Sequence, residues 1–135
     1  MLKQIEQRFA EIVPAVDFCS LRFVQDRSEQ IEVRQDVLQP VATAVDGGAM
    51  LTVIHKGGSG YGATSDLSVA GLKRAAAEAV AWAARTAGRT VVDFAKVPPT
   101  VPRGEYATTV TKPWDTLSLA DKVDLLKREC ARLKI

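Results

Sequence analysis

The sequence is poor in the residues from which metal and redox sites are built. It has one histidine, His55, and two cysteines, Cys19 and Cys130, that lie far apart and form no CxxC pair. A zinc site needs several converging ligands, and no HExxH motif is present, so no metal site is expected. The cysteines are expected to be buried thiols in a reducing compartment. His55 is expected to be a strand-end residue that is hydrogen-bonded or half exposed.

Long apolar runs and an excess of one charge are also missing. The N-terminus lacks the apolar core of a signal peptide, and no stretch approaches the roughly 20 apolar residues of a membrane span. The 18 basic and 16 acidic residues nearly balance, which does not favour nucleic acid or an anionic membrane as a partner. With 47% hydrophobic residues the chain can form a core. We therefore expect a globular, cytoplasmic protein.

The glycine-rich stretch GSGYGA at 58–63 fits the loose dinucleotide-binding pattern GxGxxG/A and follows the apolar run 50–54. In that fold the helix begins at the last small residue of the motif. Here the turn-forming residues 64–66 intervene, and neither GK[ST] nor a GxSxG elbow is present. The glycines therefore indicate a hairpin in which missing side chains permit close packing or a bulge, and nucleotide binding remains a distant alternative.

Hydrophobic periodicity predicts an α+β fold with a mostly antiparallel sheet of four or five strands covered by helices. Strands are expected over residues 17–27, 31–34, 40–45, 49–55 and 61–64. Turns are expected at residues 28–30 and 47–48. A helix over residues 2–13 packs against the core, and an alanine-rich helix over residues 67–87 covers one face of the sheet.

Five residues are expected to have structural roles. Gly60 and Gly62 allow the tight hairpin, and either Asp66 or Ser68 caps the long helix. Trp82 adds the bulk that the alanine stripe lacks and anchors the helix to the sheet. No catalytic, cofactor-binding or metal-binding residue is predicted.

The chain divides by composition into three segments. Residues 1–90 form an α/β domain, and residues 91–117, with four prolines, form a strap or linker. A final helix starts at Ser118, which forms a capping box with Asp121. Because no residue terminates this helix before Ile135, we expect it to lead to a downstream domain of a longer protein.

The segment GYGATSDLS at 60–68, followed by the alanine-rich helix, resembles the N-terminal domain of the TldD/PmbA family. These metallopeptidases are also called modulators of DNA gyrase. In that family a helix and a strand hairpin precede an apolar strand, a turn, a G-x-(A/G)-x-(T/S)-x-D-L-S segment and a covering helix. The same order is expected here. The segments PRGEY at 102–106 and KPW at 112–114 are similar to the connection that follows in TldD-like members.

The resemblance implies a cytosolic peptidase several times longer than this chain, acting on peptides or partly unfolded polypeptides as a homodimer or a heterodimer of two related subunits. It implies zinc held by a histidine-glutamate motif in a later region, so no metal ligand falls on this sequence. One of the two subunit types lacks that motif. The present domain then contributes to dimer contacts or to the wall of the peptide cavity. The alternative is a free-standing module that regulates a partner such as a topoisomerase or an antitoxin.

Overall fold

A computed structural model describes residues 1–92, 94 and 104–133 of the chain. These residues form two compact units. The first unit comprises Met1–Asp26 and Asp46–Val101, and the second comprises Arg27–Val45 and Pro102–Ile135. Most of the central part of the proline-rich strap expected over residues 91–117, namely residues 93 and 95–103, lies outside the described residues.

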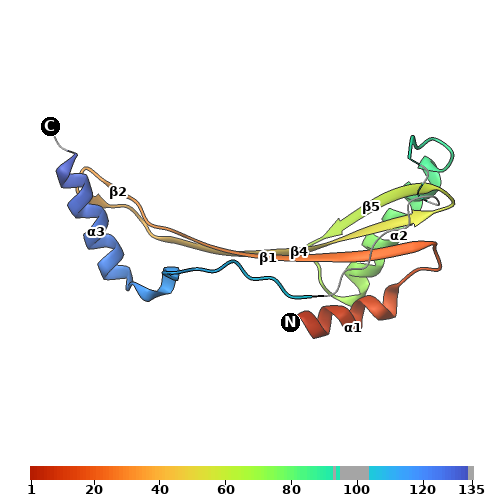
Figure 1. Cartoon of the computed structure of the whole chain (residues 1–135), viewed down its shortest axis with the longest axis horizontal. Coiled ribbons are helices and arrows are strands. Elements are labelled where there is room, and N and C mark those ends of the chain that lie inside the picture. Colours follow the sequence, from red (N-terminus) through yellow and green to blue (C-terminus); the bar gives the residue numbers. More distant parts are fainter. Residues whose placement is uncertain (93, 95–103, 134–135) are drawn as a thin grey trace. The chain divides into compact units, whose positions relative to one another are not determined.

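The first unit is a three-stranded sheet with helices packed on one side. The strand order is β1-β4-β5, with α2 along one face and α1 packed against α2 (Figure 1). The elements are α1 (Leu2–Ile12), β1 (Phe18–Gln30), β4 (Ala42–His55), β5 (Gly58–Thr64) and α2 (Val69–Thr86). Among the described residues, no helix is both long enough and apolar enough to cross a membrane.

Strands β4 and β5 form an antiparallel hairpin whose register runs from His55↔Gly58 to Ala49↔Thr64. Its two-residue turn consists of Lys56 and Gly57, with φ angles of 51° and 77°. Two successive positive φ angles define a type I′ turn, which matches the right-handed twist of paired strands. The turn therefore lies ahead of the glycines of β5, which belong to the strand itself.

The core lies between this sheet and α2. Leu51 and Val53 of β4 and Leu72 of α2 are its largest fully buried side chains. Three alternate residues of β5 that face the helix are glycines, and a Cβ atom on any of them would overlap a backbone carbonyl oxygen of α2. The three pairs are Gly58 with Ala83, Gly60 with Ala79, and Gly62 with Ala75. The sheet and the helix are thus in contact backbone to backbone along this line.

The α+β class is confirmed, but the sheet is smaller than expected. It has three strands. The other two strands among the described residues, β2 (Val33–Arg34) and β3 (Val37–Leu38), pair with each other in a separate ribbon. The turns expected at 28–30 and 47–48 lie inside the long strands β1 and β4. Glycine pairs and polar triplets are compatible with extended backbone, so their presence alone did not locate the turns.

Gly60 and Gly62 lie within the β4–β5 hairpin but outside its turn, and their missing side chains permit the close packing that was expected as the alternative to a bulge. The role expected of Trp82 differs in the structure. Trp82 does not anchor the helix through its ring, which is about half exposed and lies 5.0 Å from the Arg85 guanidinium carbon. The small residues of β5 bring the helix too close for a ring to enter the contact.

The start of α2 is capped by Ser68. Its hydroxyl accepts a hydrogen bond from the backbone N–H of Gly71 at 3.1 Å. Asp66, the other residue considered for the cap, accepts from the backbone N–H of Ser68 at 3.0 Å and from Arg74 at 2.8 Å. Asp66 therefore orders the segment that leads into the helix.

The second unit contains the β2–β3 ribbon, a short 3₁₀ helix η1 (Trp114–Thr116) and the helix α3 (Leu119–Arg132), which packs against the ribbon. The capping box expected at the start of the final helix is present. The Ser118 hydroxyl accepts from the backbone N–H of Asp121, whose carboxylate accepts from the backbone N–H of Ser118.

Candidate functional site

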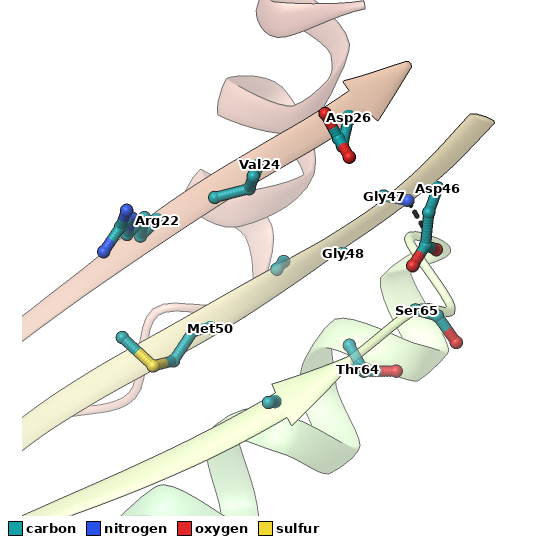
Figure 2. A pocket seen from close by; sticks show the side chains of 11 residues that line it. Arg22, Val24, Asp26, Asp46, Gly47, Gly48, Met50, Thr64 and Ser65 are labelled. Atoms are coloured by element: carbon teal, nitrogen blue, oxygen red, sulfur yellow. Dashed lines mark hydrogen bonds between the residues drawn. The ribbon is translucent and has the colours of Figure 1, made fainter. Parts of the chain in front are cut away.

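A groove of about 630 Å³ lies on the sheet of the first unit. Core-facing residues of β4, such as Leu51, alternate with Met50, which therefore points to the face opposite α2. The groove is lined by residues of all three strands and of the segment after β5. They are Arg22, Val24 and Asp26 of β1, residues 46–50 of β4, Ala63 and Thr64 of β5, and Ser65 (Figure 2).

Small residues form the floor of this groove. A Cβ atom on Gly48 would lie 3.1 Å from the carbonyl oxygen of Thr64, and one on Gly47 would lie 3.3 Å from that of Val24. Both distances are tighter than ordinary van der Waals contact, so a side chain at either position would require the neighbouring backbone to shift by a few tenths of an ångström. The glycines keep the floor low between the taller side chains of Val24 and Met50.

Opposite charges flank the groove at its two ends. Arg22 lies at one end, near Met50, and Asp26 and Asp46 lie at the other (Figure 2). The Asp46 carboxylate accepts a hydrogen bond from the backbone N–H of Gly47 at 2.7 Å, which fixes its position. Within the described part of the chain, Arg22 and Asp26 have no hydrogen bond or ion pair through their side chains. Their charges are available to a partner.

His55 lies outside the groove, at the end of β4 beside the hairpin turn, and is half-buried. Its Nδ1 is 3.6 Å from Oδ1 of Asp17, which is too far for a hydrogen bond, while Oδ2 of Asp17 accepts from the backbone N–H of Lys56 at 2.7 Å. No three histidine, cysteine or acidic side chains within residues 1–92 and 104–133 gather in a way that could hold a metal ion. The residues around His55 therefore do not fit a zinc site.

The two cysteines are free thiols, and both are half-buried. Cys19 packs against the core from β1, and burial raises the pKa of its thiol above the ordinary value. A raised pKa leaves less of the reactive thiolate at neutral pH, so Cys19 is poorly suited to nucleophilic chemistry.

A second hollow lies within the second unit, around Glu29, Trp114 and Lys122. One oxygen of Glu29 accepts hydrogen bonds from Trp114 Nε1 at 2.5 Å and from Lys122 Nζ at 2.9 Å, and Nζ also lies 4.2 Å from the centre of the Trp114 ring. The hydrogen bond from Lys122, followed by that from Trp114, lowers the pKa of the Glu29 carboxyl. Because these three groups satisfy one another, the cluster attaches α3 and η1 to β1 rather than forming a reactive site.

Sequence reasoning did not identify the groove. It singled out none of its larger side chains, which are Arg22, Val24, Asp26, Asp46 and Met50. The usable signal was the period-two pattern of β1, which continues through Val24 and Asp26, and an apolar residue, Met50, at an outward position of β4. Neighbouring apolar side chains that form a continuous patch on the outer face of a sheet indicate an interaction surface, whereas a single one does not.

Residues 19–83 match the sequence model of a protein family described as PmbA/TldA metallopeptidase domain 1. The match begins in β1 and ends in α2, so it includes the lining of the groove and the contact between the β5 glycines and the α2 alanines. A search among curated proteins gives no significant match.

Proposed function

We propose, because residues 19–83 match the sequence model of PmbA/TldA metallopeptidase domain 1, that this chain is the non-catalytic N-terminal part of a zinc peptidase. The substrates are peptides or partly unfolded polypeptides. Zinc is held by a later region, which is compatible with a histidine, His55, that has only the Asp17 carboxylate near it and belongs to no cluster of three potential ligands among the described residues. The subunits assemble as a homodimer or with a related subunit.

The groove face is the part of this domain that supports an interaction role. Helix α2 covers the opposite face of the sheet, and Val24, Met50 and Tyr61 remain 48%, 37% and 60% exposed on the groove side. Three adjacent strands with apolar outward residues around a low floor form a surface that excludes water when covered. This observation supports a domain that contributes a subunit contact or one wall of the peptide cavity.

The peptidase proposal is tested by comparing the longest natural protein that contains this chain with residues 1–135 alone. Hydrolysis of a fluorescently labelled, unfolded casein is measured before and after zinc chelation, and again after zinc is restored. The longer protein should show zinc-dependent hydrolysis and residues 1–135 none. Zinc-dependent hydrolysis by residues 1–135 would overturn the division of labour. A zinc-loaded longer protein without hydrolysis would overturn the peptidase proposal and favour a regulatory module.

A further inference from the structure

We propose that the side-chain hydroxyls of Thr86 and Thr90 close the half of the free edge of β5 that lies next to the β4–β5 turn, so that no further strand can pair there. The free edge is the side of β5 that faces away from β4, and it ends the sheet because the strand order is β1-β4-β5. An edge strand presents a row of unpaired backbone N–H and C=O groups, which is a template for pairing with another chain. This role does not depend on the proposed peptidase function.

The backbone groups of β5 face β4 and the free edge in turn. In an antiparallel pair, residues whose N–H and C=O both point to the partner strand alternate with residues whose two groups both point away from it. Ser59 points away from β4, because its N–H donates to the Thr86 hydroxyl at 2.9 Å and its C=O accepts from the same hydroxyl at 2.8 Å. Tyr61 and Ala63, which follow at alternate positions of β5, therefore also face the free edge.

The two threonines take the place that a paired strand would have at this edge. A residue of a paired strand exchanges two hydrogen bonds with the residue opposite, one from each N–H, and the Thr86 hydroxyl alone replaces both bonds to Ser59. The Thr90 hydroxyl donates to the carbonyl oxygen of Gly57 in the turn at 2.9 Å. The close contact between strand and helix makes this possible, since a Cβ atom on Gly58 would overlap the carbonyl oxygen of Ala83 near the end of α2.

The other half of the free edge stays open. The hydrogen bonds of the described residues include none to the groups of Tyr61 or Ala63 that point away from β4. An open edge this short is a poor template, because very short edges are one of the means by which proteins prevent strand addition. Without the Thr86 hydroxyl, Ser59 would join the open residues, and unpaired groups would then recur at every second residue along most of β5.

The test compares Thr86→Val, which keeps the branched shape but lacks the hydroxyl, with Thr86→Ser, which keeps the hydroxyl, in the whole 135-residue chain. Hydrogen exchange measured by NMR should show the Ser59 amide protected in the unmodified chain and in Thr86→Ser. It should exchange at least about fivefold faster in Thr86→Val. Light scattering should show larger assemblies of Thr86→Val than of the unmodified chain at equal concentration, because β5 edges of separate copies can then pair.

Ser68→Ala is the matched control for lost stability, because it removes a hydroxyl from the opposite end of α2 and leaves the contact between Thr86 and Ser59 intact. It should keep the Ser59 amide protected and the assembly size unchanged. Tyr61→Pro, added to Thr86→Val, removes an N–H from the open edge and should reverse the extra association. An unprotected Ser59 amide in the unmodified chain would overturn the inference without any variant. Unchanged assembly of Thr86→Val, or equal association of Ser68→Ala, would also overturn it.

Discussion

Gly60 of β5 lies directly against the backbone carbonyl oxygen of Ala79 in α2, with no room for a side chain between them. The same contact recurs two residues along the strand and four along the helix in each direction. Two residues of a strand span about 6.7 Å and four residues of a helix about 6 Å, so alternate glycines stay nearly in step with alanines one turn apart. This spacing explains why the glycine-rich strand and the alanine-rich helix occur together.

Gly60→Ala should destabilise the fold strongly. The added methyl group would overlap the carbonyl oxygen of Ala79 and approach the backbone nitrogen of Ala83 to 2.6 Å, and backbone atoms cannot turn away as a side chain can. Overpacking of this kind costs about 2 kcal/mol or more in free energy of unfolding. Urea denaturation followed by circular dichroism measures the change.

Gly104→Ala is the matched control for this substitution. A Cβ atom at Gly104 meets nothing within 4 Å, so the free energy of unfolding should stay within about 0.5 kcal/mol of the original. Equal effects of the two substitutions would show that Gly60 does not set the distance between helix and strand.

Ser68→Ala should cost about 1 kcal/mol of stability, because the N–H of Gly71 loses its hydroxyl acceptor at the start of α2. Ser68→Asp keeps an acceptor at the same position and should retain most of the stability. Thermal unfolding of the two variants distinguishes capping from a general loss of contacts. If both variants lost stability equally, the hydroxyl of Ser68 would not be the cap.

The sequence predicted the element types better than their roles. Period-two and helical patterns located both long helices and the β4–β5 hairpin, because burial on one face produces these patterns directly. The roles of Gly60 and Trp82 depended on how closely two backbones approach. That distance is set by pairs of residues far apart in the chain, which local patterns do not report. The groove was missed for a similar reason, since Arg22 and Asp46 come together only when β1 and β4 pair.

Leu72→Ala should destabilise the protein far more than Trp82→Ala. Leu72 is fully buried between α2 and the sheet, and removing such a side chain costs about 3 kcal/mol through lost transfer energy and the cavity that remains. The half-exposed Trp82 ring loses its contact with Arg85, which contributes about 0.5–1 kcal/mol at an exposed site. Urea midpoints of the two variants provide the comparison. A larger loss for Trp82→Ala would restore the ring as the anchor of the helix.

Acidification should loosen the second unit through Glu29. The hydrogen bonds from Lys122 and Trp114 lower the pKa of Glu29 in the folded chain. The ionised carboxylate therefore stabilises the fold at a pH above the unfolded-state pKa of about 4.3. This stabilisation is lost as the pH falls through the lower pKa of the folded state. Trp114 reports this change directly, because its indole N–H donates to the same carboxylate oxygen. In a Trp82→Phe background, Trp114 is the only tryptophan, and its fluorescence should change over that acidic range.

Glu29→Gln separates this effect from a general acid transition. An amide cannot gain or lose a proton at acidic pH, so the fluorescence change of Trp114 assigned to Glu29 should disappear. The buried Lys122 also loses its anionic partner, since Lys122 is only 8% exposed and Glu29 forms its one ion pair among the described residues. An unpaired buried charge is costly, so this variant should already be less stable at neutral pH. An unchanged acid transition in Glu29→Gln would mean that another carboxylate controls the attachment of α3.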